Sequence, residues 1–123
     1  MGFSKTCLIV DDFASTRRVV KIALENKGYE VLEATQGKEA LQILQQKNIS
    51  IVLTDLNMPE MDGIDLVRAI RALERYQNLP VILISTEARS ARKQEAFQAG
   101  ATSFLAKPFT MEQLCGVIEK AAL

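Results

Sequence analysis

Five short apolar runs alternate with five segments of helical periodicity, and this alternation limits the fold more than any other feature of the sequence. The apolar runs occupy residues 6–10, 29–34, 49–55, 80–85 and 102–106, and the helical segments occupy 14–27, 38–47, 90–99 and the residues that follow Asp62 and Thr110. Runs without polar alternation are typical of parallel strands buried on both faces. A repeated strand–helix order predicts a parallel sheet covered by helices on both faces, with right-handed crossovers. We therefore expect one α/β domain over residues 1–123.

Four of the five predicted strands end in polar side chains. The run 49–55 ends in Asp55, and Met58-Pro59 then breaks regular structure. The other polar strand ends are Asp11-Asp12, Ser85 and Lys107. Because the carboxyl ends of parallel strands share one edge of a sheet, we expect these groups to converge on one crevice. Taken singly, each has a simpler interpretation: Asp55 as a turn cap, Asp11-Asp12 as a helix N-cap pair, and Lys107 as a solvated side chain.

Three carboxylates in one crevice favour a bound cation. At ~4 Å, each pair of unit charges costs about 4 kcal/mol at an effective dielectric constant of 20. Either the carboxyl pKa values rise or a cation lies among the groups. Oxygen ligands without histidine or cysteine favour Mg²⁺, which commonly shares its coordination shell with phosphate. A carboxylate nucleophile with Mg²⁺, Lys107 and the Ser85 hydroxyl is a set of groups suited to in-line phosphoryl transfer.

Composition excludes several other classes of function. The chain contains no histidine, which removes Ser-His and Cys-His nucleophiles and most transition-metal sites. Lysine and arginine together number 15, as do aspartate and glutamate together. The formal net charge is therefore zero, and no excess of basic charge points to binding of nucleic acid or of a membrane surface. The apolar runs are far shorter than a membrane span, and Met1–Lys5 lead directly into a strand without room for a signal peptide. We therefore expect a cytoplasmic protein without a nucleic-acid or membrane partner.

Several further side chains are expected to have no role in chemistry. Arg68 and Arg71 should point outward from the helix that follows Asp62. Arg89, Arg92 and Lys93 should form a solvated face of the helix 90–99. Cys7 and Cys115 are interpreted as structural thiols.

The sequence resembles the receiver domains of bacterial two-component response regulators, in their stand-alone, chemotaxis-type (CheY-like) form. The resemblance covers essentially the whole chain. It is carried by Leu8-Ile9-Val10-Asp11-Asp12, Asp55-Leu56-Asn57-Met58-Pro59 with Asp62-Gly63, Pro80-Val81-Ile82-Leu83-Ile84-Ser85, and Lys107-Pro108-Phe109. The resemblance, and not the periodicity, implies a doubly wound, flavodoxin-like (βα)5 three-layer sandwich whose five parallel strands have the order 2-1-3-4-5.

The resemblance also assigns roles to residues. It implies that Asp55 is the phosphoacceptor, and that Asp11, Asp12, Asp55 and the backbone carbonyl of Asn57 hold Mg²⁺. It implies that Lys107 pairs with the phosphoryl group and precedes a cis peptide bond to Pro108. Ser85 and Phe104 are the implied switch residues. The surface formed by the fourth helix, fifth strand and fifth helix would then bind a downstream effector protein.

Two residues depart from the pattern of the family. Phe104 replaces the tyrosine common in chemotaxis members, so a switch at this position acts through its shape alone. A half-buried aromatic residue without a switch role is the alternative. Thr86 is bulkier than the alanine or glycine usual after the switch serine, and we expect it to narrow access to the phosphoryl group and to change its lifetime.

The leading hypothesis is a phosphorylation-controlled binding module rather than an enzyme with turnover. A histidine kinase or a histidine phosphotransfer protein would supply the phosphoryl group, because the chain has no histidine of its own. An Asp-nucleophile, Mg²⁺-dependent phosphatase would carry a second aspartate two residues after the nucleophile, and that position is Asn57. A nucleotide-binding switch lacks its G-x-x-x-x-G-K-[ST] motif, and we expect no DNA-binding effector domain. A phosphate sink or relay adaptor remains the alternative to an output in chemotaxis.

Overall fold

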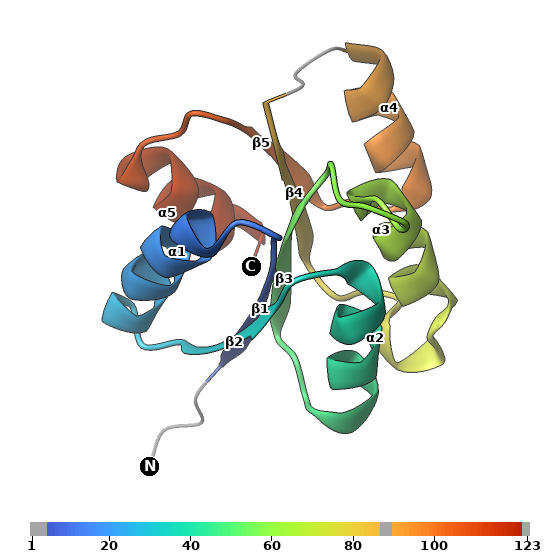
Figure 1. The fold of residues 1–123 in the computed structure, drawn as a ribbon, viewed down its shortest axis with the longest axis horizontal. Coiled ribbons are helices and arrows are strands. Elements are labelled where there is room, and N and C mark those ends of the chain that lie inside the picture. The colour runs from blue at the N-terminus through green and yellow to red at the C-terminus, as the bar shows by residue number, and fades with distance from the viewer. Residues whose placement is uncertain (1–4, 87–89, 122–123) are drawn as a thin grey trace.

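The computed structural model describes residues 5–86 and 90–121. Helices and strands alternate along the described chain as the sequence predicts (Figure 1). The elements are β1 Thr6–Val10, α1 Ala14–Asn26, β2 Glu30–Ala34, α2 Gly37–Gln46, β3 Ile51–Asp55, α3 Gly63–Ala72, β4 Val81–Ser85, α4 Ser90–Ala99, β5 Ser103–Ala106 and α5 Met111–Ala121. A short 3₁₀ helix, η1 Glu74–Tyr76, was not predicted.

The strands form one parallel sheet in the order β2-β1-β3-β4-β5, so the flavodoxin-like order is confirmed. β3 lies at the centre, and every one of its residues is buried. Val10 of β1 pairs with Thr54 of β3, so the residues that follow, Asp11 and Asp55, leave the sheet side by side. Asp55 in turn pairs with Ile84, next to the end of β4. The register therefore places three strand ends at one edge of the sheet.

Helices cover both faces of the sheet and enclose two aliphatic cores (Figure 1). α1 and α5 pack on one face, where Val20, Leu24, Leu114 and Ile118 are buried against it. α2, α3 and α4 pack on the other. Helical spacing predicts that Val19, Val20, Ala23 and Leu24 form one apolar stripe of α1, and this is only partly correct, because Val19 is 44% exposed. Full burial of one such side chain stabilises the fold by about 1.5–3 kcal/mol.

Local sequence signals set the ends of several helices. Gly28, at φ +92°, follows the C-terminus of α1 in the left-handed conformation that glycine adopts without a Cβ penalty. The spacing Thr110-x-x-Gln113 predicts a capping box before α5, and the structure confirms it. The Gln113 amide donates to Thr110 Oγ1 over 3.0 Å, and the Thr110 amide donates to Gln113 Oε1 over 2.9 Å. A second capping box, between Asp62 and Asp65, begins α3 and was not predicted.

The expectation that Arg71 points to solvent is wrong. Its Nη2 and Nε atoms donate to the Gly100 carbonyl over 2.7 and 3.0 Å, and Nη1 donates to the Tyr76 carbonyl over 2.9 Å. A guanidinium group has five donors in a planar arrangement, and two loop carbonyls lie within its reach. Arg71 therefore ties α3 to the segment before β4 and to the loop between α4 and β5.

Both cysteines are free thiols. Burial raises the pKa of the Cys7 thiol, which makes it a poor nucleophile and agrees with a structural role. None of the helices in residues 5–86 and 90–121 is long and apolar enough to cross a membrane.

Candidate functional site

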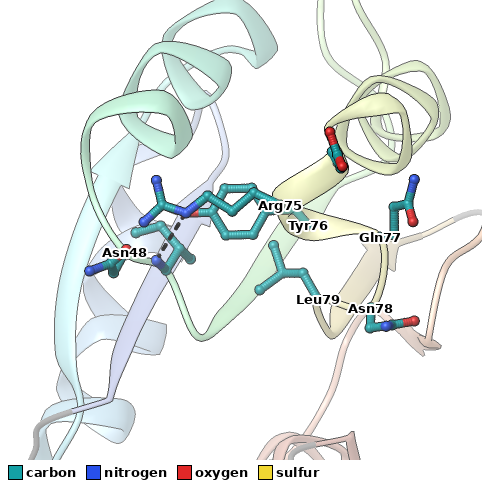
Figure 2. A pocket seen from close by; sticks show the side chains of 8 residues that line it. Asn48, Arg75, Tyr76, Gln77, Asn78 and Leu79 are labelled. Carbon is teal, nitrogen blue, oxygen red and sulfur yellow. Dashed lines mark hydrogen bonds between the residues drawn. The ribbon is translucent and has the colours of Figure 1, made fainter.

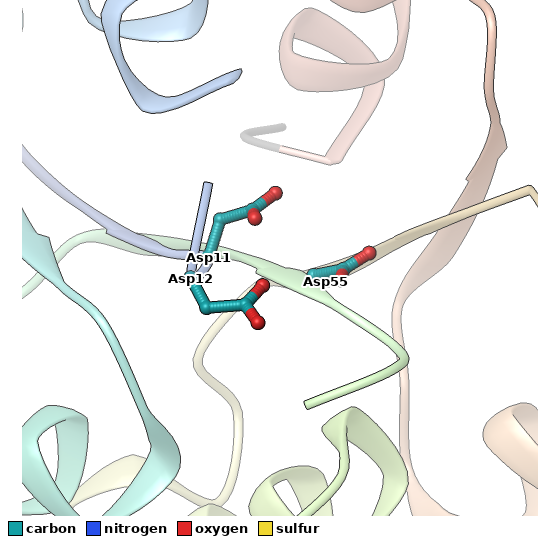
Figure 3. Close-up of side chains that lie close together, drawn as sticks. All are labelled: Asp11, Asp12 and Asp55. Carbon is teal, nitrogen blue, oxygen red and sulfur yellow. The ribbon is translucent and has the colours of Figure 1, made fainter. Parts of the chain in front are cut away.

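Three carboxylates meet at the carboxyl edge of the sheet (Figure 3). Asp11 and Asp12 follow β1, and Asp55 is the last residue of β3. One oxygen from each lies within 4.8 Å of the others. Asp11 is 2% exposed and Asp55 is 6% exposed, whereas Asp12 faces solvent. The structure therefore brings together the three acidic side chains that the sequence singled out.

Lys107 lies against two of these carboxylates. It directly follows β5, and its Nζ atom is 3.3 Å from Asp55 Oδ1 and 3.4 Å from Asp11 Oδ2. Its side chain is only 19% exposed, so the interpretation of Lys107 as a solvated side chain is wrong. The Lys107 amide also donates to the Ser85 carbonyl over 2.8 Å, which aligns the ends of β4 and β5. The peptide bond from Lys107 to Pro108 is cis, as predicted.

The pKa of Asp55 is raised from its ordinary value. Burial is the largest cause, because the charged form loses its hydration. The charge of Lys107 and its hydrogen bond oppose the rise, while the charges of Asp11 and Asp12 add to it. Burial and the neighbouring carboxylates therefore disfavour the ionised form of Asp55 more than Lys107 favours it.

The remaining predicted site residues lie around this cluster. Ser85 ends β4 and is fully buried, and Thr86 is exposed just beyond it. Asn57 is exposed in the loop after β3. Phe104 of β5 is half-buried, and Lys93 Nζ of α4 lies 5.9 Å from the centre of its ring. A distance of this length is within the usual range of a cation–π contact, although Lys93 itself is exposed.

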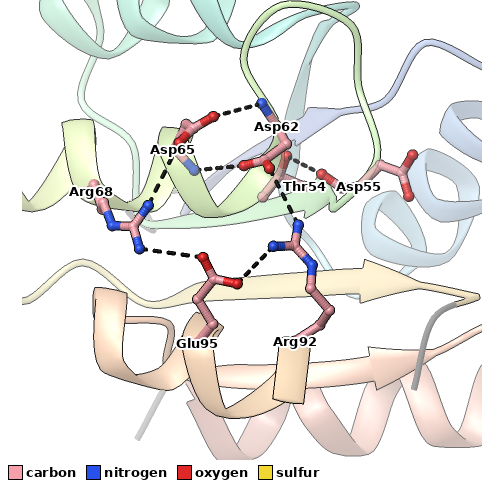
Figure 4. A network of polar contacts seen from close by, with 7 residues as sticks. All are labelled: Thr54, Asp55, Asp62, Asp65, Arg68, Arg92 and Glu95. Carbon is pink, nitrogen blue, oxygen red and sulfur yellow. Dashed lines mark hydrogen bonds and ion pairs between the residues drawn. The ribbon is translucent and has the colours of Figure 1, made fainter. Parts of the chain in front are cut away.

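An ionic network joins α3 to α4 and was missed in the sequence (Figure 4). Arg92 lies 3.2 Å from Asp62 and 2.7 Å from Glu95. Glu95 in turn lies 3.5 Å from Arg68. The solvated role expected of Arg92 is therefore wrong, since its side chain is 28% exposed and paired twice. Arg89 lies outside the described residues.

Of two pockets in the structure, one borders the acidic cluster and the other lies away from it. A pocket of about 470 Å³ is lined by Lys107, Thr86, Phe109 and residues of α1, and so borders the cluster. A pocket of about 300 Å³ lies near the start of β3 and β4 (Figure 2). It is lined by Asn48 and Ile49 on one side and by η1 and the residues that follow it, 77–79, on the other. Tyr76 is buried there, and its hydroxyl donates to the Lys47 carbonyl over 2.7 Å. This second pocket is at the opposite edge of the sheet from Asp55.

The donor set fits a hard divalent cation. Carboxylate oxygens are the only side-chain donors of the cluster, and Mg²⁺ prefers such ligands together with waters. A flavodoxin-like α/β domain with this acidic pocket and a lysine beside it has the features of a receiver domain.

The comparisons with known proteins identify the family. The chain belongs to the response regulator receiver domain family, whose model matches residues 7–119. It is 46% identical to the chemotaxis protein CheY of Pseudomonas aeruginosa over 114 residues, which cover 92% of each chain. It is 44% identical to CheY-3 of Vibrio cholerae over 114 residues, which cover 92% of this chain and 88% of that one. The solved structure of Vibrio cholerae CheY4 superposes with a TM-score of 0.93 at 36% identity, covering 97% of this chain and 99% of that one. The CheY-like resemblance is therefore confirmed.

Proposed function

We propose that this chain is a single-domain response regulator that accepts a phosphoryl group on Asp55. The observation that carries the proposal is the buried Asp55 carboxylate, 3.3 Å from Lys107 Nζ and clustered with two further carboxylates. A buried carboxylate at the end of a central strand is a nucleophile whose approach is fixed by the sheet. The similarity to chemotaxis proteins supports a role in chemotaxis. We propose that the protein acts in the cytoplasm.

In the proposed reaction, an Asp55 oxygen attacks the phosphorus of a phosphohistidine. The bond from phosphorus to the imidazole nitrogen breaks, its electron pair returns to the nitrogen, and an acyl phosphate forms. Because the chain contains no histidine, the donor is a histidine kinase or a histidine phosphotransfer protein. Water later attacks the phosphorus and returns Asp55 and inorganic phosphate. The protein thus catalyses only its own phosphorylation and dephosphorylation and is not a turnover enzyme.

Four residues would hold Mg²⁺: Asp11, Asp12 and Asp55 through their carboxylates, and Asn57 through its backbone carbonyl. Bound Mg²⁺ offsets the charge of the carboxylates and of the phosphoryl oxygens. Lys107 would exchange its contact with Asp55 for a contact with the phosphoryl group, for which an ammonium group is a suitable point charge. Asn57 also argues against a phosphatase, because an amide cannot serve as the acid and base of a hydrolytic cycle.

The output is proposed to be a change of the surface formed by α4, β5 and α5, which an effector protein binds. Ser85 would donate to a phosphoryl oxygen, and Phe104 would change its packing as β4 shifts. Lys93 lies over Phe104, so the ring and α4 are already in contact across this surface. A phosphate sink or a relay adaptor is the second candidate, and it would need no effector on this surface.

The test is treatment with acetyl phosphate and Mg²⁺ followed by intact-mass spectrometry. The wild type and the control Asp65→Asn, which alters an exposed carboxylate, should gain one phosphoryl group, and Asp55→Asn should gain none. Absence of the gain in the wild type would reject the assignment. Affinity capture with and without beryllofluoride, a phosphoryl analogue, then separates an effector-binding output from a sink. A sink predicts no protein whose retention depends on beryllofluoride.

Thr86 provides a test of phosphoryl lifetime. It is exposed and lines the pocket that borders Lys107. We expect Thr86→Ala to open the path of water and to speed autodephosphorylation. An unchanged decay rate of the labelled protein would show that Thr86 does not control access.

A further inference from the structure

Arg17 reaches back from α1 to the turn that carries the acidic pair. It lies in the first turns of α1, where side chains tilt toward the N-terminus of the helix. Its Nη1 atom donates to the Asp11 carbonyl oxygen over 2.7 Å, and its Nε atom donates to Glu33 Oε1 over 3.0 Å. The Arg17 side chain is only 16% exposed, and its bond to the Asp11 carbonyl is partly buried, whereas the Glu33 carboxylate is 36% exposed. A guanidinium group anchored on a carboxylate therefore binds the backbone between Asp11 and Asp12.

The Asp11 carbonyl belongs to the peptide unit that joins the two acidic residues. Pairing of β1 with β2 ends just before it, with the Asp11 amide donating to the Ala34 carbonyl over 3.1 Å. The Asp11 carboxylate has partners of its own, since Oδ1 accepts from the Phe13 amide over 2.9 Å and Oδ2 faces Lys107. The Asp12 side chain is exposed, so its direction depends on the backbone that bears it.

We infer that Arg17 is a positioning residue for the Mg²⁺ site, which holds the Asp11–Asp12 peptide so that both carboxylates face Asp55. The inference rests on the proposed function, because that function requires the metal. Partners that orient metal ligands typically change metal affinity by 10–100-fold when they are removed. Arg17 differs from such partners in that it acts on the backbone between two ligands.

Two effects of removing Arg17 have opposite signs, and this makes the inference testable. Loss of a positive charge near three carboxylates would, by Coulomb attraction alone, tighten the binding of a cation. Loss of the bond to the Asp11 carbonyl would loosen the Asp11–Asp12 peptide and weaken the binding. The direction of the change in Mg²⁺ affinity therefore separates positioning from charge.

The experiment is a Mg²⁺ titration of the unphosphorylated protein, followed by the amide NMR shifts of Asp12 and Phe13. Arg17→Met retains much of the aliphatic stem but no donor, and we expect it to raise the Mg²⁺ dissociation constant about tenfold. Arg17→Lys keeps the charge and a donor and should give an intermediate constant. Lys21→Ala is the matched control: it removes the same charge from α1 and the other contact to Glu33, at 3.5 Å, and should leave the affinity unchanged.

A second measurement does not depend on the metal. In the metal-free protein, Arg17→Met should increase hydrogen exchange at the Phe13 amide, which bonds to Asp11, and Lys21→Ala should not. If Arg17→Met binds Mg²⁺ as tightly as the wild type, or more tightly, the positioning role is overturned while the proposed function stands. A wild type that binds no Mg²⁺ rejects the proposed metal site, and the role of Arg17 with it.

Discussion

Gly63 allows α3 to begin directly against Asp55, and Gly63→Ala is expected to disturb the site through its backbone. A Cβ atom at this position would lie 2.5 Å from the Asp55 carbonyl oxygen, 2.6 Å from Leu83 Cδ2 and 2.9 Å from Leu56 Cα. Two of these three atoms belong to the backbone and cannot move aside as a flexible side chain would. The Gly63 amide also donates to the Leu56 carbonyl over 2.7 Å, which fixes the approach.

The expected loss of stability follows from these distances. Forcing an additional carbon into a closely packed site costs about 1–3 kcal/mol, and the better helix propensity of alanine returns at most about 1 kcal/mol. When the full gain in propensity is subtracted, we expect Gly63→Ala to lower the free energy of unfolding by up to about 2 kcal/mol. It should also slow phosphorylation of Asp55 by acetyl phosphate, because the Asp55 carbonyl must shift.

Urea denaturation followed by far-UV circular dichroism measures this change as a lower midpoint at an unchanged slope. Gly116→Ala is the control, because Gly116 lies within α5 and a Cβ atom there meets no atom within 4 Å apart from the adjacent residues and backbone of its own helix. It should raise stability by about 0.5–1 kcal/mol through propensity alone. Equal stabilisation by the two substitutions would refute the argument that the approach at Gly63 is tight.

Three further predictions concern backbone strain, ion pairs and pH. Glu60 is exposed at φ 68°, so Glu60→Gly should stabilise the fold by up to about 1 kcal/mol in urea denaturation, whereas Glu60→Ala, which keeps the Cβ atom, should not. Arg92→Ala should cost about 0.5–1 kcal/mol at low salt and less at high salt, because its partners Asp62 and Glu95 are partly exposed; an effect that does not depend on salt would contradict an ionic origin. The pKa of Asp55 is raised above 3.8, so the folded state binds this proton more tightly than the unfolded chain, and stability is lost as pH rises from 3.8 through the raised pKa. In thermal melts without Mg²⁺, Asp55→Asn should therefore be more stable than the wild type at neutral pH, with a gap that narrows as pH falls toward 3.8; a gap independent of pH would exclude this origin.

The sequence was sufficient to predict the fold and the centre of the site because both depend on simple periodicities. Apolar runs and helical spacing determine the strand–helix order, and parallel strands bring their carboxyl ends to one edge. Asp11, Asp55 and Lys107 could therefore be expected to meet without knowledge of any distance. The strand order came from the resemblance, since periodicity alone does not order the strands.

The side chains that the sequence did not predict bind partners on other elements. Arg92 contacts Asp62, 30 residues away in the sequence, because α3 and α4 pack with one particular relative rotation. Helical spacing in the sequence does not reveal that rotation. Arg71 turns from solvent to the Gly100 carbonyl for the same reason. Arg17 was also missed, since periodicity shows which face a residue occupies but not how far its side chain reaches along the helix.

The register of the sheet brings negative charges close together at this site. Asp11 and Asp55 directly follow paired residues of adjacent strands, so neither can move away from the other without breaking the sheet. Lys107 contributes one positive charge against three carboxylates, which leaves two negative charges when all are ionised. A divalent cation would balance them, whereas protonation of Asp55 would remove only one and would inactivate the nucleophile. The same strand ends that build the core therefore keep Asp55 buried within an acidic cluster whose net charge a divalent cation would balance.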